Sequence, residues 1–334
     1  MAELLETRRI VLAGASSLLG ADLKSLLEES RFAASDFRLV DEETVAGILT
    51  EAGGEPVVIQ TVEEDSFARA WIVFFTGSAA FTRRNFELAK RSGARVVDLS
   101  GALAGDPVAK LWLPKWDRSA GVSSQEDLGA FLVPSAAAET VARLAVALKS
   151  FSPRALTAVA FQPVSASGKA GIEELESQTS HLLSFQSIGK QLFDAQVAFS
   201  MLDRFGPASG QKLKESLDRL RQELRSCLPG GILAPTVQLL HAPVFYGTTV
   251  AASAYLDASA DLVAIAKACA EAGFSVTTGD SAPSNISAAG ESAIQLAPPE
   301  ADGANPGVWW FWAAADNLRL PASNAVKLAE KLLE

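Results

Sequence analysis

The chain has 334 residues, of which 49% are hydrophobic and 20% charged, as in a folded protein with room for about two packed domains. Its formal net charge of −10 leaves no broad cationic surface, so we expect no nucleic-acid partner. Two cysteines and two histidines are too few for a disulfide framework or a Cys/His metal cluster. Without a signal-peptide pattern or an apolar stretch of ~18 residues, we expect a cytoplasmic protein with no metal and no membrane contact.

Strands and helices are predicted to alternate in the first 130 residues. A short β-branched run at residues 8–14 ends at Gly14, and residues 21–32 then carry leucines at helical spacing. Further strands are predicted at residues 36–41, 56–60, 71–77 and 94–101, the second and third of them buried, with a helix at 83–93. This alternation predicts an α/β fold with a doubly wound parallel sheet.

The pattern changes after residue 128. The apolar spacing predicts helices at residues 136–151, 171–185, 211–228, 260–273 and 323–334. Residues 156–168 are predicted as a strand that enters a Gly/Ser turn, and residues 236–256 as one or two strands punctuated by Pro243 and Gly247. The second half is therefore predicted to be a mixed α/β domain that is partly antiparallel.

The first candidate site is the turn GASSLLG, residues 14–20. A glycine after a strand lets the backbone approach a pyrophosphate, and the free N–H groups of the following helix form an anion site. Two glycines six residues apart are a weak signal, so a tight turn without any ligand is an equal alternative.

Motifs along the chain resemble those of the aspartate-semialdehyde dehydrogenase family. GASSLLG resembles the family's GATGAVG turn, with Ser17 in place of the middle glycine. Residues 94–106, 131–141 and 161–175 fall where the family has its DNSSAFRMD, ANPNCSTI and YQAVSGAGKAGIDEL segments. Residues 241–250 and 316–330 occupy the places of RVPVFRGHSE and DNLRKGAALNAVQIAE. The matches keep their order and spacing from Ile10 to Glu330.

The resemblance implies two domains in a homodimer. Residues 1–133 plus 317–334 would form a Rossmann-type dinucleotide-binding domain, and residues 134–316 a central α/β dimerisation and substrate domain with a mixed sheet. The implied nucleotide contacts are Gly14, Ser16, Ser17, Leu18, Leu19, Gly20, Asp41, Thr76, Gly77, Ser165, Gly168 and Asn317.

The cofactor pocket departs from the family after the second strand. Many members have ASxRS there, whose serine and arginine hold the NADP 2′-phosphate, whereas this chain has Val40 followed by Asp41, Glu42 and Glu43. Carboxylates repel a 2′-phosphate but accept from a ribose hydroxyl. We therefore expect weak binding of NAD or NADP, with NAD preferred. A solvated helix start is the alternative reading of this acidic run.

The family reduces aspartyl phosphate with NADPH through a cysteine thiolate and an acid/base histidine. Here the cysteine position is Ala136 and the histidine position Thr248, while the arginines for substrate carboxylate and phosphate fall on His241 and Ala104. Ser135 is expected to cap a helix, with no visible base to activate its hydroxyl. The resemblance implies that Gln162 and Lys214 are retained from the family and that Gln211 stands in the place of a glutamate.

Two of these residues keep structural alternatives: His241 as a packing histidine, and Gln162 as a strand amide paired to backbone. The leading hypothesis is a catalytically silent family member, resembling the members known as USG-1 proteins, that acts through dimerisation, an unidentified protein partner or residual nucleotide binding. The alternative is an active NAD(P)-dependent oxidoreductase of this type, in amino-acid biosynthesis from aspartate, with an altered mechanism or substrate. A structural subunit without ligand is a third class.

Overall fold

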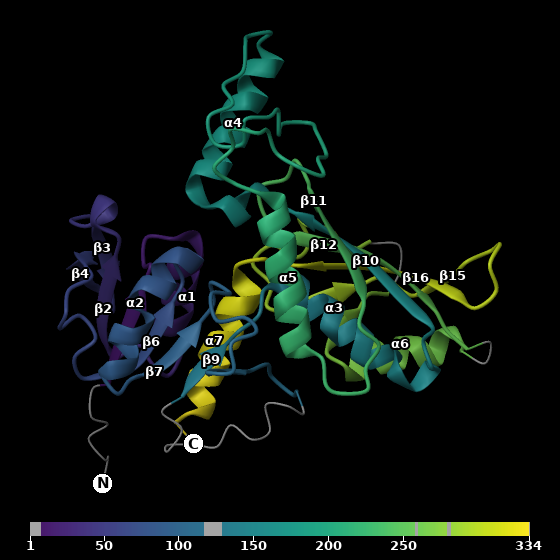
Figure 1. Cartoon of the computed structure of the whole chain (residues 1–334), viewed down its shortest axis with the longest axis horizontal. Coiled ribbons are helices and arrows are strands. Elements are labelled where there is room, and N and C mark those ends of the chain that lie inside the picture. The colour runs from purple at the N-terminus through teal and green to yellow at the C-terminus, as the bar shows by residue number, and fades with distance from the viewer. Residues whose placement is uncertain (1–7, 117–128, 258–259, 279–281, 334) are drawn as a thin grey trace. The chain divides into compact units, whose positions relative to one another are not determined.

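The computed structural model describes residues 8–116, 129–257, 260–278 and 282–333. The chain divides into two compact units (Figure 1): an N-terminal unit of Met1–Pro134 with Pro321–Glu334, and a C-terminal unit of Ser135–Leu320. The predicted fold class is confirmed, because the large sheet of the N-terminal unit is parallel and the large sheet of the C-terminal unit is mixed. The domain boundaries given above stay a prediction.

The N-terminal unit is built on a seven-stranded sheet in the order β5-β2-β1-β6-β7-β9-β8. All of its strand pairs are parallel. Its strands are β1 (Arg9–Ala13), β2 (Asp36–Asp41), β5 (Gln60–Thr61), β6 (Ala70–Phe75), β7 (Arg95–Asp98), β8 (Ala109–Leu111) and β9 (Ala130–Leu132).

Helices cover both faces of this sheet. Helices α1 (Leu18–Glu28) and α7 (Arg319–Lys331) share one hydrophobic core with Ile10 and Leu12 of β1. Helix α2 (Ala79–Arg91) packs with Val11 on the other face. Because both faces are covered, the strands read as continuous apolar runs in the sequence.

Helices α1, α2 and α7 begin earlier than the apolar spacing predicts, because a side chain caps each of them at its N-terminus. The Ser17 hydroxyl accepts the Gly20 N–H at 2.9 Å, so α1 begins inside the glycine turn. Ser78 likewise caps α2 by accepting the Phe81 N–H at 3.1 Å. Helix α7 begins at Arg319 because Asp316 caps it, and Pro321 is tolerated where no N–H is needed.

The prediction of a buried strand at residues 56–60 is wrong. Strand β4 (Glu55–Val58) forms an antiparallel hairpin with β3 (Leu49–Ala52), outside the main sheet, and only β5 joins the sheet edge. Val58 is 45% exposed. The reason is local: Pro56 has no N–H for a central strand, and Gly53 and Gly54 both adopt positive φ, as a two-residue hairpin turn requires.

The C-terminal unit contains a mixed sheet in the order β11-β10-β12-β16-β14-β13. Strand β10 is parallel to β11 and antiparallel to β12, which pairs antiparallel with β16. The strands are β10 (Ala155–Gln162), β11 (Thr236–His241), β12 (Thr248–Tyr255), β13 (Phe274–Val276), β14 (Ile294–Leu296), β15 (Glu300–Ala301, beside β16) and β16 (Val308–Ala315). Residues 236–256 thus form two strands, whereas β16 was not predicted.

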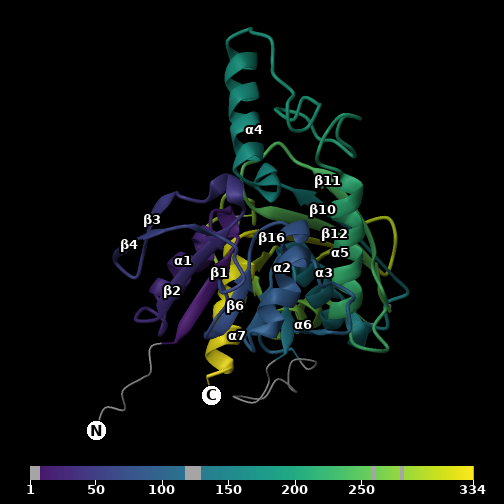
Figure 2. The same cartoon turned by 60° about the vertical axis from the view of Figure 1, so that its left-hand side comes forward.

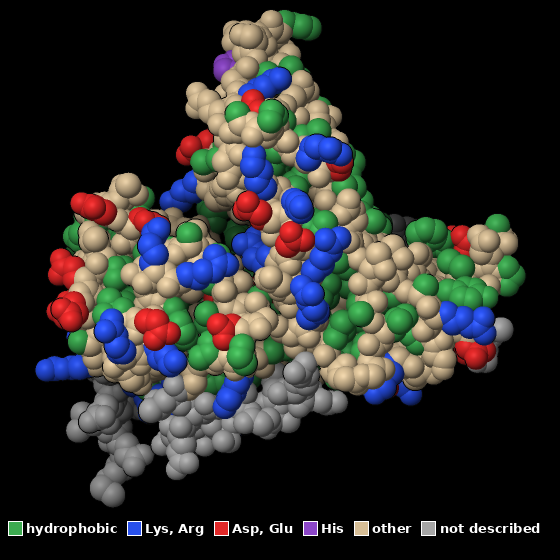
Figure 3. All heavy atoms as spheres, viewed as in Figure 1, with side chains coloured by type: hydrophobic (Ala, Val, Ile, Leu, Met, Phe, Trp, Pro, Cys, Tyr) green, Lys and Arg blue, Asp and Glu red, His purple; other side chains and the backbone are tan. Residues whose placement is uncertain are grey.

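Helices α3 (Ala136–Ala147), α5 (Leu213–Cys227) and α6 (Leu262–Glu271) form a layer in which α3 contacts β10, β12 and β16. Helix α4 (Gly168–Leu183) projects from the sheet together with the segment that follows it (Figure 2). Among the described residues, short 3-10 helices are formed by η1 (Glu43–Val45), η3 (Leu148–Phe151) and η4 (Val164–Ser167). Figure 3 shows basic and acidic side chains interspersed over α5.

None of the helices in the described part of the chain is long and apolar enough to cross a membrane. The described residues also contain no group of three or more His, Cys, Asp or Glu side chains arranged to hold a metal ion.

Candidate functional site

The glycine turn brings the ends of β1 and β6 into backbone contact. Gly14 has φ +93°, and a Cβ on it would lie 2.2 Å from the nitrogen of Gly77. A Cβ on Gly20 would lie 2.6 Å from the Gly14 oxygen. Thr76 completes the contact by donating its hydroxyl to the Gly14 oxygen at 3.0 Å. These glycines are therefore required by the fold itself, with or without a ligand.

The turn offers an anion fewer free donors than its sequence indicates. The Ser16 N–H donates to Asp41 Oδ2 at 2.8 Å, and the Gly20 N–H is taken by Ser17, whose hydroxyl also donates to the Thr76 oxygen. Within the described residues, only the N–H groups of Leu18 and Leu19 at the start of α1 lack a partner in this turn. A pyrophosphate would thus meet two donors and a nearby carboxylate.

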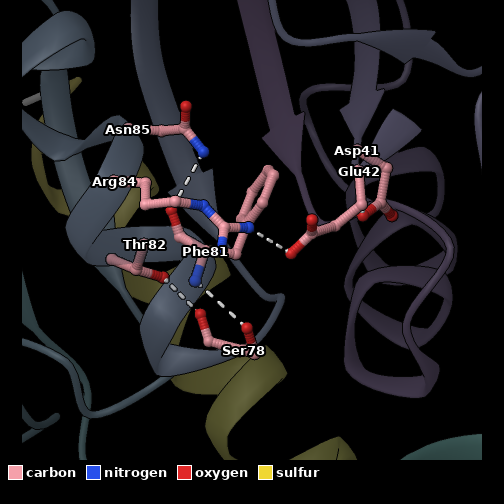
Figure 4. Close-up of polar contacts among 7 residues, drawn as sticks. All are labelled: Asp41, Glu42, Ser78, Phe81, Thr82, Arg84 and Asn85. Atoms are coloured by element: carbon pink, nitrogen blue, oxygen red, sulfur yellow. Dashed lines mark hydrogen bonds and ion pairs between the residues drawn. The ribbon is translucent and has the colours of Figure 1, made fainter. Parts of the chain in front are cut away.

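Asp41 is fixed between two backbone donors. It is 6% exposed, and its second oxygen accepts the Glu42 N–H at 2.8 Å. Each carboxylate oxygen has a further lone pair, so a ribose hydroxyl can still donate to it. The solvated-helix alternative fits Glu43, which begins η1, but not the buried Asp41. Glu42 pairs with Arg84 of α2 at 2.5 Å (Figure 4).

In the C-terminal unit, three predicted positions lie in one row across the sheet. Gln162 pairs in register with His241, and its neighbour Phe161 pairs with Thr249, which places Thr248 beside Gln162. Strands β11, β10 and β12 thereby bring together the three positions to which the resemblance assigns an arginine, a glutamine and a histidine of the family. The side-chain amide of Gln162 makes no hydrogen bond to another residue in the described part of the chain.

His241 is enclosed by packing. Its Nε2 lies 3.2 Å from the Val197 carbonyl, which can only accept, so the proton sits on Nε2. The rings of Phe193 and Phe205 pack against it. Burial lowers the pKa of His241, and the carbonyl contact opposes this only in part. A ring whose pKa is lowered from its ordinary value of 6.5 is mainly neutral at pH 7, so it does not supply the positive charge of the arginine that the resemblance assigns to this position.

We expect His241 to make the protein less stable in mild acid. The fold favours the neutral ring, so the unfolded chain takes up the proton more readily, and the free energy of unfolding falls as the pH drops below about 6.5. Thermal melts between pH 8 and pH 5 measure this. His241→Gln should flatten the dependence, whereas the same change at His181, on α4, should leave it unchanged; equal slopes in both variants would contradict the assignment.

Ala136 is the first residue of α3, and its methyl group is 1% exposed. Ser135 caps the helix, as expected, by accepting the Ala138 N–H. The expectation that its hydroxyl has no base nearby is wrong, because the hydroxyl donates to the buried carboxylate of Glu223 on α5. The Ser135 N–H donates to the same oxygen at 3.2 Å. No local sequence pattern predicts this pairing, since the partners are 88 residues apart in the chain.

The C-terminal unit also brings together two predicted nucleotide contacts. Asn317 donates to the Ser165 hydroxyl at 3.1 Å and accepts the Gly247 N–H at 2.9 Å. Gly168 has φ +74° at the start of α4, three residues after Ser165. Asn317 therefore holds the η4 turn next to the loop that precedes β12.

The remaining predicted positions make few side-chain contacts. Lys214 is exposed on α5, and Gln211 contacts Ser209 through its backbone. Ala104 lies in the turn after β7 and bonds through its N–H to Gly101. Both cysteines are buried, and burial raises the pKa of Cys269 to about 12, so neither is placed to act as a nucleophile.

A cavity of about 430 Å³ lies on the N-terminal unit, lined in part by Arg38, Glu63 and Asp65. None of its lining residues belongs to the glycine turn. It is therefore separate from the predicted nucleotide crevice.

The chain belongs to the semialdehyde dehydrogenase family. The family's model of the NAD binding domain matches residues 9–123, and its model of the dimerisation domain matches residues 144–320. A Rossmann-type nucleotide-binding domain and a dimerisation domain are thus both present.

The chain is similar over nearly its whole length to curated and solved relatives. A USG-1 protein homolog of Azotobacter vinelandii is 31% identical over 97% of both chains. The structure of a probable aspartate-semialdehyde dehydrogenase from Pseudomonas aeruginosa is 27% identical, with a TM-score of 0.88 over 98% of this chain and 99% of that one. A structure of aspartate semialdehyde dehydrogenase II from Vibrio cholerae, at 21% identity, shares the fold with a TM-score of 0.83 over 98% of each chain.

Proposed function

We propose that this chain is a catalytically silent member of its family that retains dimerisation and weak nucleotide binding. The observation that carries the proposal is the alanine at the start of α3, where the family has its cysteine. A methyl group cannot form a thioester, so the covalent step has no acceptor. Assay of the unmodified protein for NAD(P)H formation from aspartate semialdehyde and phosphate tests this, and we expect no product.

The residues around the missing thiol support the same conclusion. Thr248 has no titratable group near pH 7, so it cannot act as the acid or base. The neutral ring of His241 and the methyl group of Ala104 stand where the family has cationic side chains. Glu223 adds a carboxylate at the helix start, which opposes a second negative charge there.

Weak nucleotide binding is proposed from the donors in the glycine turn. The N–H groups of Leu18 and Leu19 would hold the pyrophosphate, and Asp41 would accept from the ribose of NAD. Bound there, the nucleotide would supply a hydride acceptor or donor. The donors already taken by Asp41 and Ser17 keep the affinity low.

Homodimerisation is proposed through the uncovered face of the mixed sheet. This face carries Trp310, 49% exposed, beside Trp312 and Tyr255, while α3 packs on the opposite face. An apolar sheet face with exposed tryptophans is what a large obligate interface requires. A second copy of the dimerisation domain is its proposed occupant.

We expect Trp310→Ala to weaken the dimer by about 30-fold, because truncating a tryptophan buried in an interface typically costs ~2 kcal/mol. Sedimentation or light scattering over a dilution series measures the effect. Val263→Ala on α6, in the helix layer, is the matched control and should leave association unchanged. A monomeric wild-type protein at micromolar concentration would sink the proposal.

The alternative is an active oxidoreductase of the same family that uses a noncovalent route or another substrate in amino-acid biosynthesis. One feature favours it: the family's glutamine is kept as Gln162, in the same row as Thr248. Turnover that is abolished by Gln162→Ala would support this alternative over the silent one.

A further inference from the structure

An exposed ion pair links the segment that follows β2 to helix α2, which follows β6. Arg84, in the second turn of α2, places its Nη2 2.5 Å from Oε1 of Glu42, which follows β2 (Figure 4). The two side chains are 58% and 43% exposed. A pair so exposed to solvent contributes little to stability, so the fold does not depend on it.

This pair lies where the adenosine half of a dinucleotide would bind. In doubly wound sheets the ligand occupies the carboxyl ends of the strands, and the residue after the second strand contacts the ribose. Asp41 holds that position here, and Glu42 is the next residue. The guanidinium of Arg84 is therefore held by a carboxylate one residue beyond the ribose acceptor.

We propose that the Glu42–Arg84 ion pair decides between NAD and NADP, a proposal that rests on the nucleotide binding proposed above. While Glu42 neutralises Arg84, the carboxylates of Asp41 and Glu42 repel a ribose 2′-phosphate, and Asp41 accepts the free hydroxyl of NAD. Without the Glu42 charge, the planar guanidinium is free to bind a phosphate through two hydrogen bonds. Arg84 then takes the role of the arginine that accommodates a 2′-phosphate.

Calorimetric titration of NAD and NADP into four proteins tests the proposal: wild type, Glu42→Gln, Glu42→Gln with Arg84→Gln, and Glu43→Gln. We expect Glu42→Gln to tighten NADP about tenfold with NAD unchanged, and the added Arg84→Gln to abolish the gain. Glu43→Gln removes the same charge from an exposed residue that does not contact Arg84, so it should change NADP affinity less than about twofold. An equal gain in Glu43→Gln, or a gain that survives loss of Arg84, would overturn the proposal.

The same four proteins should be titrated with 5′-AMP and with adenosine 2′,5′-bisphosphate, which report on the adenosine end alone. If neither dinucleotide binds but the bisphosphate tightens only in Glu42→Gln, the proposed nucleotide binding fails and the role of the ion pair stands. If NAD binds but no probe with a 2′-phosphate responds to Glu42→Gln, the role of the ion pair fails alone. Unchanged melting temperatures confirm that the variants fold.

Discussion

Ala136→Cys alone should yield no measurable aspartate-semialdehyde dehydrogenase activity. The substitution returns a thiol to the start of α3, but catalysis also needs a base, which typically contributes about 10²–10⁴-fold and which Thr248 cannot supply. The carboxylate of Glu223 also opposes formation of a thiolate beside it. When several catalytic groups act as a unit, restoring only one of them recovers little activity.

The combined variant Ala136→Cys, Thr248→His, His241→Arg and Ala104→Arg should gain activity that no single change shows. Burial of His241 makes the arginine the most disruptive of these changes, so the triple variant without it is the matched control for folding. The pH dependence of alkylation should give a lower thiol pKa when Glu223→Gln is added to Ala136→Cys. Turnover by Ala136→Cys alone would show that the remaining pocket is intact, contrary to the account.

Gly14→Ala should destabilise the N-terminal unit by about 2–5 kcal/mol, the sum of positive-φ strain and overpacking. The new Cβ would lie 2.2 Å from the Gly77 nitrogen, a backbone atom that cannot move aside without separating β1 from β6. Gly54→Ala is the matched control: its φ is also positive, +80°, but its Cβ would meet nothing within 4 Å. That variant should lose only about 1–2 kcal/mol.

Denaturant unfolding of both variants measures the difference, with the Gly14 variant also losing any nucleotide binding. Equal losses in the two variants would mean that the close contact between Gly14 and Gly77 does not hold the turn.

Much of the fold could be predicted from the sequence because the signals are local. The apolar runs of β1 and β6 and the leucine spacing of α1 each mark one element. Local patterns do not predict β16 (VWWFWAAA), because its alternation of exposed and buried aromatics ends in three buried alanines and follows a loop rich in Gly and Pro. The wrong prediction at residues 56–60 rests on an apolar run as well. There Pro56 favours a hairpin outside the main sheet rather than a central strand.

The site was less predictable because its decisive contacts join distant residues. The family resemblance predicts roles for Ala136 and Thr248, but the carboxylate beside the start of α3 comes from Glu223 and the cation beside the acidic run from Arg84. The spacing of residues along the sequence cannot predict such contacts, because they form only when the helices and strands pack together. The occupation of the Ser16 N–H by Asp41 likewise depends on the register of β1 and β2.

The most direct test of the silent-enzyme account is an assay of the unmodified protein with aspartate semialdehyde, phosphate and NAD or NADP. An active family member of similar fold serves as the positive control, and the Gln162→Ala variant as the check that any signal arises in this pocket. We predict no phosphate-dependent formation of NADH or NADPH above the no-protein background. Phosphate-dependent formation that is abolished by Gln162→Ala would contradict the account.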